Sequence, residues 1–244
     1  MPQNFAVVFP HSDDLTIFAG GLVRQLVLAG DTGYFIKITN DDKDSYDLSP
    51  GETMRRIELE TEQVAAALGL TKVYGLGYQN HYLQHGQLIE LRHRLITLFR
   101  FLRIDTVISF DPWARVEENP DHTLTGLAVE AACWMAGRGH DLPELIDLGL
   151  EPRAVGHKYY AARDPQLLDH PVDVTPVLAD KRAALRLHRT PMDRMWREHL
   201  ADHPDRPVTL EEFIESSFLE LDDHGRHLEQ FRYLGPRESE KKGV

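Results

Sequence analysis

The sequence predicts a single α/β domain with a mostly parallel sheet and helices on both of its faces. Short apolar segments alternate with longer segments of helical spacing along residues 5–135. This alternation is typical of parallel strands joined by crossover helices. With 244 residues, 42% of them hydrophobic, the chain can bury one sizeable core. We assign residues 1–236 to this domain and expect residues 237–244 to be a charged, disordered tail.

The first half of the chain carries the clearest alternation. Residues 5–9 form an apolar segment that ends at Pro10, which predicts a short buried strand followed by a helix over 15–29. A serine cap, a proline and a glutamate at positions 49, 50 and 52 start the next helix, and Gly69 ends it. The other elements expected here are strands at 34–39, 72–76 and 105–110 and a helix at 87–103.

The second half is less regular. Asn119 and Pro120 are a good cap and first position for a helix that runs to about residue 135. Residues 210–221 fit a helix or a strand equally. The remaining expectations are an irregular segment at 138–153, a strand at 154–161 and helices at 176–188 and 192–203.

Composition excludes several classes of function. A net charge of −12 argues against nucleic acid or an anionic membrane as the main partner. No run of about 18 apolar residues is present, and the N-terminus lacks a signal sequence, so we expect a cytoplasmic protein. The single cysteine, Cys133, is expected to be a buried inert thiol. The acidic clusters at 41–44 and 117–118 are expected to be solvated, and the sequence leaves a homo-oligomer open.

Three ionisable side chains follow the first strand within four positions. His11, Asp13 and Asp14 lie where the strand ends and the next helix begins. In open α/β sheets ligands bind at this edge. Three such groups would repel one another or titrate awkwardly without a cation, so the simplest interpretation is a divalent metal. The adjacent aspartates cannot point the same way, so one can bind metal while the other faces water.

A second motif belongs at the same edge of the sheet. The strand at 105–110 is followed by Asn119-Pro-Asp-His122, which places His122 in the first turn of a helix. There the helix dipole favours neutral imidazole, the form that binds metals. Two histidines and one carboxylate with an open position are the arrangement of hydrolytic zinc sites and disfavour Mg²⁺ or Mn²⁺ in phosphoryl chemistry. The carboxylates in the first turn argue against a dinucleotide site at Gly20-Gly21.

Together these motifs resemble the PIG-L or LmbE-like superfamily of zinc-dependent N-deacetylases. The resemblance covers about the first three quarters of the chain, and the opening motif of that family is usually His-Pro-Asp-Asp, with serine in place of proline here. It implies a Rossmann-like fold, in agreement with the order of elements. The segments that carry it are Pro10-His-Ser-Asp-Asp14 with Gly20-Gly21, Leu76–Asn80, Phe110–Trp113, Asn119–His122 and Asp173–Arg189.

The resemblance implies a role for each residue of the motifs. His11, Asp14 and His122 would bind one Zn²⁺ per chain. Asp13 would be the general base that activates the zinc water, and the acid that protonates the leaving amine. The expected partner is a small-molecule N-acetylated amino sugar or glycoconjugate. The alternative is a metal-binding protein of the same fold that binds a sugar or regulates without catalysis, its chemistry weakened at Asn119.

Asn119 is one departure from the family pattern. Many members have a histidine there that stabilises the oxyanion, whereas an amide can donate a hydrogen bond but carries no charge. Asn119 is therefore a candidate catalytic residue or only the helix cap, with His188 or Arg115 as substitutes for the histidine. His188 is otherwise expected near a helix C-terminus.

Recognition of the substrate differs as well. Asn80-His81 replaces an Asp-Gly pair whose aspartate contacts a sugar hydroxyl in the family. Arg56 or its neighbour Arg55 would match a substrate-binding arginine, and Trp113 would stack on a sugar or pack in the core. The candidate substrate-binding residues are therefore Arg56, Asn80, Trp113 and His188. The other histidines, among them His81 and His227, are expected at the surface.

Overall fold

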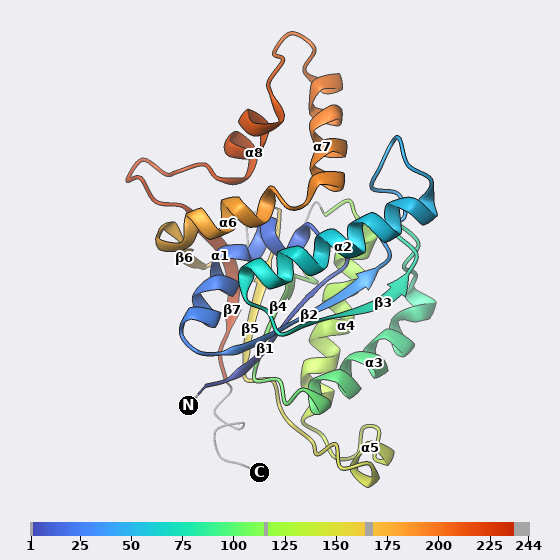
Figure 1. Ribbon diagram of the computed structural model, residues 1–244. Coiled ribbons are helices and arrows are strands. Elements are labelled where there is room, and N and C mark those ends of the chain that lie inside the picture. Colours follow the sequence, from blue (N-terminus) through green and yellow to red (C-terminus); the bar gives the residue numbers. More distant parts are fainter. Residues whose placement is uncertain (1, 115–116, 164–167, 237–244) are drawn as a thin grey trace.

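The computed structural model describes residues 2–114, 117–163 and 168–236, and within these ranges one seven-stranded sheet forms the centre of the molecule (Figure 1). The strand order is β3-β2-β1-β4-β5-β7-β6. The first five strands in this order are parallel, and β7 runs antiparallel to both of its neighbours. The strands are β1 (Asn4–Phe9), β2 (Thr32–Thr39), β3 (Lys72–Tyr78), β4 (Thr106–Phe110), β5 (His157–Ala161), β6 (His170–Asp173) and β7 (Leu228–Leu234).

Helices cover both faces of the sheet, as predicted. One face packs against α3 and α4, and the other packs against α1, α2 and α6, so that the sheet separates two hydrophobic clusters. Cys133 is buried in the first cluster, which confirms the prediction of a buried thiol. The helices are α1 (Asp14–Leu28), α2 (Pro50–Leu68), α3 (Leu88–Phe101), α4 (Pro120–Ala136), α5 (Glu144–Asp147), α6 (Leu178–Leu185), α7 (Arg189–Asp202) and α8 (Leu210–Phe218), with 3₁₀ turns at His85–Gln87 and Thr175–Val177.

The first half of the chain matches the predicted elements, whereas the second half departs from them. The sequence gave no sign of β6 and β7, and the helix expected at 176–188 ends at Leu185. Residues 210–221, which fitted a helix or a strand, contain α8. Strand β7 was missed because its apolar alternation is interrupted by Glu229 and Arg232. Both of these charged groups have partners inside the fold: Glu229 pairs with Lys181, and Arg232 pairs with Asp111.

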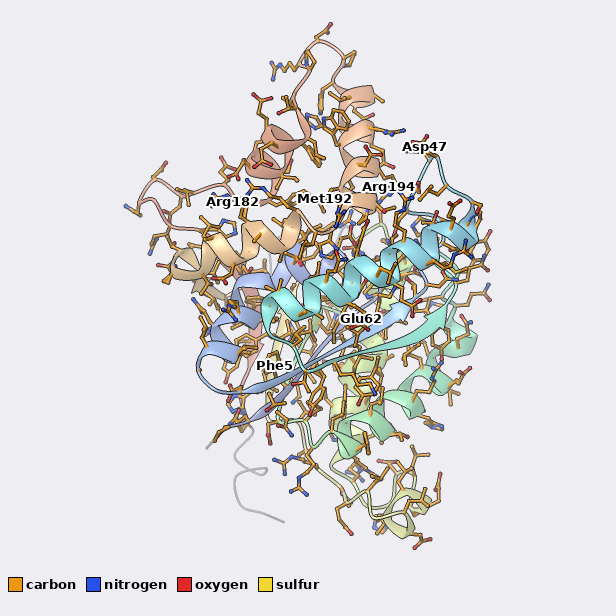
Figure 2. All side chains as sticks on the ribbon, viewed as in Figure 1. Phe5, Asp47, Glu62, Arg182, Met192 and Arg194 are labelled. Carbon is orange, nitrogen blue, oxygen red and sulfur yellow. The ribbon has the colours of Figure 1, made fainter. Side chains whose placement is uncertain are left out.

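Helix α7 and helix α8 extend beyond the sheet and form a third, smaller cluster with α6. Met192, Phe213 and Ile214 are buried in it (Figure 2 labels Met192). This subdomain-like extension rises over the edge of the sheet where the parallel strands end (Figure 1). Among the described residues, no helix combines the length and the apolar character that crossing a membrane requires.

A buried ion pair is inserted into helix α1. The Lys181 ammonium lies 2.8 Å from Glu229 and donates to the carbonyl of Ile17. Glu229 in turn accepts from the backbone N–H groups of Gly21 and Leu22 at 2.7 and 2.8 Å. In a regular helix the Ile17 carbonyl would pair with the Gly21 N–H, so the ion pair serves the backbone groups of one helical turn.

The two glycines at this point allow a close approach. A Cβ atom on Gly21 would lie 2.4 Å from the side chain of Val174, a distance that real contacts do not show. The ion pair and this contact together fix the first turn of α1, which begins at Asp14. The orientation of that turn therefore depends on residues more than 150 positions away in the sequence.

We expect Lys181→Met to lower the free energy of unfolding by about 3–5 kcal/mol, because Glu229 would keep a buried charge without its counter-ion. Chemical denaturation would measure the change. Arg182→Met is the matched control, since the adjacent side chain forms a 2.5 Å pair with Glu215 that is about one third exposed. That variant should lose less than about 1 kcal/mol. Equal losses in the two variants would contradict a special role for the buried pair.

Candidate metal centre

The sheet brings the two predicted motifs together. Strands β1 and β4 are neighbours and pair in parallel, so their C-terminal ends lie side by side. His11 and Asp14 follow β1, and His122 lies in the first turn of α4 beyond β4. The predicted position of all three side chains at one edge is therefore confirmed. These three residues form a buried group whose candidate ligand atoms all lie within 4.8 Å of one another.

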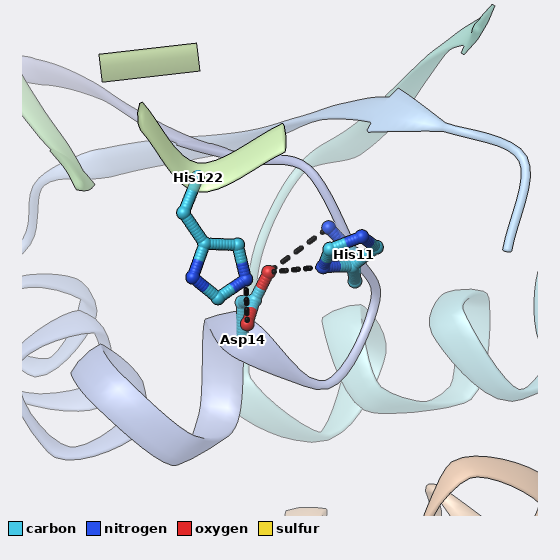
Figure 3. A group of neighbouring side chains, drawn as sticks. All are labelled: His11, Asp14 and His122. Carbon is cyan, nitrogen blue, oxygen red and sulfur yellow. Dashed lines mark hydrogen bonds and ion pairs between the residues drawn. The ribbon is translucent and has the colours of Figure 1, made fainter. Parts of the chain in front are cut away.

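The Asp14 carboxylate lies between the two imidazole rings (Figure 3). One oxygen is 3.1 Å from Nδ1 of His11, and the other is 3.6 Å from Nε2 of His122. Burial opposes the charge on Asp14, but His122 and His11 lower its pKa below the usual value. Burial alone would lower the pKa of His11, yet the surrounding carboxylates of Asp14, Asp121 and Asp41 raise it well above the usual value.

Carboxylates also lie behind both rings. Nε2 of His11 is 3.3 Å from Asp121 and 3.1 Å from the amide oxygen of Asn80. Nδ1 of His122 is 3.1 Å from Glu117. An acceptor behind each imidazole holds the ring and leaves the other nitrogen free to face a cation, which is how histidine ligands of metals are usually supported. Two nitrogens and a carboxylate, so supported, fit a divalent metal ion.

Asp13 lies beside this group and is not part of it. Its Oδ1 accepts from the N–H of Asp14 at 3.1 Å and caps helix α1. Burial, with the charge of Asp14, raises the pKa of Asp13 to about 6. Asp44 lies close behind, where burial and the charges of Asp41 and Asp13 raise its pKa to about 8. A carboxyl group with a pKa near neutrality can both accept and return a proton.

A cavity of about 450 Å³ opens onto these groups. Asn119 lines it and also caps helix α4, since its side-chain oxygen accepts from the N–H of Asp121 at 3.0 Å. The cap uses the oxygen, which leaves the amide hydrogens as donors. The lining residues are His11, Asp13, Asp14, Ile17, Phe18, Asp44, His81, Asn119, His122, Ala162, Arg163, Arg194, Met195, Ser217 and Phe218.

The structure does not bring the expected substrate-binding residues into this cavity. Arg56 lines a separate hollow of about 440 Å³ between α2 and α7. Trp113 is 60% exposed, so it does not pack in the core, and its Nε1 donates to Glu130. Asn80 is buried because it holds His11, as described above.

His188 is fully buried and does not line the cavity either. It caps α7 at its N-terminus, not a helix C-terminus as expected, and its Nε2 lies 2.9 Å from the hydroxyl of Thr16. Burial lowers the pKa of His188 to about 3, so the ring is neutral. Arg115, the other substitute considered for the family histidine, lies outside the described residues.

Several residues that line the cavity were not predicted from the sequence. Asp44 was expected in a solvated loop, but it is only 4% exposed and lies 3.4 Å from Nε of Arg194. Figure 2 shows Arg194 on helix α7. Glu117 was likewise expected in solvent, and its side chain is buried beside His122. No local pattern marks these residues, because their partners come from distant elements.

His81 is exposed as expected, but it faces the same cavity. Its backbone has a φ of 63°, a left-handed conformation that is uncommon for a histidine. The His81 N–H donates to Asp121 at 2.6 Å, and its ring centroid is 6.2 Å from that of His11. Backbone strain of this kind is often found at functional sites.

Comparison with known proteins supports the same assignment. Residues 6–133 match the PIG-L family, described as GlcNAc-PI de-N-acetylase. A diacetylchitobiose deacetylase from Thermococcus kodakarensis is 30% identical over 202 residues, which cover 78% of this chain and 72% of the relative. The chain belongs to the PIG-L family. It is accordingly an amide hydrolase of the N-deacetylase type.

Solved structures of similar shape include two enzymes of different chemistry. The N,N′-diacetylchitobiose deacetylase from Pyrococcus horikoshii superposes with a TM-score of 0.78 at 24% identity and covers 96% of this chain and 84% of its own. A 4-carboxy-2-hydroxymuconate hydratase from Pseudomonas putida gives a TM-score of 0.68 at 16% identity and covers 96% of this chain and 97% of its own. At these identities the likeness concerns the fold alone.

We expect His122→Ala to weaken zinc binding by more than about 100-fold, because one of three ligands is lost. Glu117→Gln should weaken it by about 10–100-fold, the usual effect of changing a group behind a ligand. Competition with a chelator followed by metal analysis would measure both. His224→Ala, in an exposed turn, is the control and should leave binding unchanged. Full zinc occupancy in His122→Ala would contradict its place in the site.

We expect the neutral His188 to make stability depend on pH. The folded pKa of about 3 lies below the usual value, so the unfolded chain binds a proton that the folded chain excludes. The free energy of unfolding should therefore fall as the pH drops from about 6.5 towards 3, by up to about 1.4 kcal/mol per pH unit.

Denaturation at pH 5 and pH 7 would test this dependence with matched variants. His188→Gln should reduce the difference in stability between the two pH values, whereas His224→Gln, at an exposed position, should leave it as in the wild type. The same pH dependence in all three proteins would show that His188 does not exclude a proton on folding.

Proposed function

We propose that this chain is a zinc-dependent hydrolase that removes the N-acetyl group from an N-acetylated amino sugar or glycoconjugate. One observation supports this above all: a buried His-Asp-His group lies beside a separate carboxylate, Asp13, at the base of a cavity large enough for a sugar. The deacetylase from T. kodakarensis, whose name gives a disaccharide of this kind as its substrate, supports the choice of substrate class.

The metal would be held by His11, Asp14 and His122. Zinc is the metal that two imidazoles and one carboxylate suit best. When bound at such a site it supplies Lewis acidity, which polarises a carbonyl group and makes water more acidic. The residues behind the ligands, Asp121 and Glu117, would keep both rings in the orientation that binding requires.

Asp13 would move the protons of the reaction. In its ionised form it accepts a proton from the water that attacks the acetamide carbonyl carbon. The bond between that carbon and the sugar nitrogen then breaks, Asp13 returns the proton to the nitrogen, and acetate and a free amine leave. A pKa of about 6 places the group where both transfers are feasible near neutral pH.

Two neutral donors would face the developing oxyanion. Asn119 presents its amide hydrogens to the cavity, and His81 lines the same space close to His11. Donors of this kind stabilise charge that appears only in the transition state. Around them, Asp44, Arg163 and Arg194 provide the charged groups that bind sugar hydroxyls.

We expect Asp13→Asn to lower kcat by about 10²–10⁴-fold, the range for loss of a general acid and base. Amine release from a panel of N-acetylglucosamine conjugates would measure activity, and metal analysis should find zinc near one per chain in both proteins. Asp47→Asn, in the separate hollow near α2, is the control and should keep full activity. Loss of zinc in Asp13→Asn would contradict its assignment as a residue that is not a ligand.

A further inference from the structure

The metal cavity continues into a second hollow of about 240 Å³. We call this hollow the distal lobe. Five residues line both spaces, so the two meet between helix α1 and helix α8. The shared residues are Ile17, Phe18, Ala162, Ser217 and Phe218, and the distal lobe is completed by Lys181, Glu220, His227, Leu228, Glu229 and Gln230.

The junction of the two spaces is apolar and partly aromatic. Phe18 and Phe218 are half-buried there, and Phe18 is supported from within by an edge-on contact with Phe110 at 4.9 Å between ring centroids. An exposed face of a firmly packed aromatic ring suits the apolar face of a sugar ring. Beyond the junction, Ser217 and Gln230 offer uncharged hydrogen-bonding groups at the exposed rim.

His227 presents an unpaired acceptor in the distal lobe. The residue is 8% exposed, and its Nδ1 lies 2.8 Å from the carbonyl oxygen of Glu220. Because a carbonyl only accepts, Nδ1 carries the proton of the neutral ring and Nε2 is a bare acceptor. Burial and the nearby Lys181 lower the pKa of His227, which keeps the ring neutral. Among the described residues Nε2 has no hydrogen-bond partner.

An unpaired buried acceptor is uncommon in a folded protein and calls for a donor. The charge around His227 indicates which kind of donor. Lys181 and Glu229, the two charged groups buried in the wall, neutralise each other at 2.8 Å. The lobe therefore offers a ligand neither a free buried cation nor a free buried anion from these two groups. A neutral hydroxyl group fits such a place better than a phosphate or a carboxylate does.

We propose that the distal lobe is a second sugar subsite. It would hold the ring next to the N-acetylated ring, with a hydroxyl of that second ring donating to Nε2 of His227. This inference rests on the proposed function, and it narrows the substrate to a chain of at least two sugar units. The N-acetylated ring lies in the metal cavity, and the aromatic junction separates the two rings.

Two substitutions at one position test the acceptor. In His227→Asn the side-chain amide keeps a donor near the Nδ1 position and loses the acceptor, whereas in His227→Gln the amide oxygen reaches the Nε2 position. The full-length, zinc-loaded chain would be assayed with N-acetylglucosamine and N,N′-diacetylchitobiose. His224→Asn, in the neighbouring exposed turn, is the matched control.

We expect wild type to prefer the disaccharide, with a kcat/KM at least about tenfold higher, because only the disaccharide gains the contacts of a second ring. His227→Asn should lower kcat/KM for the disaccharide by about three- to tenfold, the effect of one uncharged hydrogen bond. It should leave the monosaccharide unaffected, and His227→Gln should recover most of the loss. No preference for the disaccharide, or an equal effect of His227→Asn on both sugars, would overturn the subsite.

Binding without turnover separates this inference from the proposed function. Calorimetry would compare chitobiose with glucosamine on the same zinc-loaded proteins. Tighter binding of chitobiose that is weakened in His227→Asn supports the subsite even if neither acetylated sugar is hydrolysed, in which case the proposed function fails alone. Equal binding of the two amines overturns the subsite even if N-acetylglucosamine is deacetylated.

Discussion

The Asp14 carboxylate lies between the imidazoles of His11 and His122, and this contact depends on the neighbouring positions of β1 and β4 in the sheet. Three groups that attract or carry charge are buried there together. Such a group is stable only if each charge has a partner. The structure supplies partners behind each ring, namely Asp121 and Glu117, and it leaves the inner nitrogens and the Asp14 oxygens facing one another. A cation is the natural complement of that inner face.

The second half of the chain determines what surrounds this centre. Lys181 and Glu229 hold the backbone of α1 one turn beyond Asp14, and the same pair forms part of the wall of the distal lobe. Helix α7 brings Arg194 to the cavity, and α8 brings Phe218. The sheet therefore positions the reacting groups, whereas the extension formed by α6, α7 and α8 shapes the space in which a substrate would lie.

The comparisons illustrate why fold and chemistry have to be argued separately. A hydratase and a deacetylase both superpose on this chain over almost its full length. Function lies in the side chains that a shared scaffold presents, and those side chains can change while the scaffold stays the same. For this chain the match to the PIG-L family and the relative at 30% identity decide the class of reaction. The groups that line the cavity then bear on the substrate.

The sequence by itself determined the parallel half of the sheet, its covering helices and the group His11, Asp14 and His122. Local signals are sufficient for these features: apolar strands, capped helices and polar residues directly after strand ends have the same meaning in any context. Parallel pairing then brings strand ends to one edge without further information. The placement of Asp13 beside the ligands follows from its adjacency to Asp14.

Only the tertiary structure decided the rest of the site. Asp44 and Glu117 look like solvated acids in the sequence, and they are buried because Arg194 and His122 reach them from other elements. Strand β7 was hidden by charges whose partners lie elsewhere in the chain. Long-range pairing leaves no periodic trace, since a buried charge needs a partner in space and not at a fixed spacing in sequence. For the same reason the expected substrate-binding residues lie outside the cavity, while His81, Arg163 and Arg194 line it.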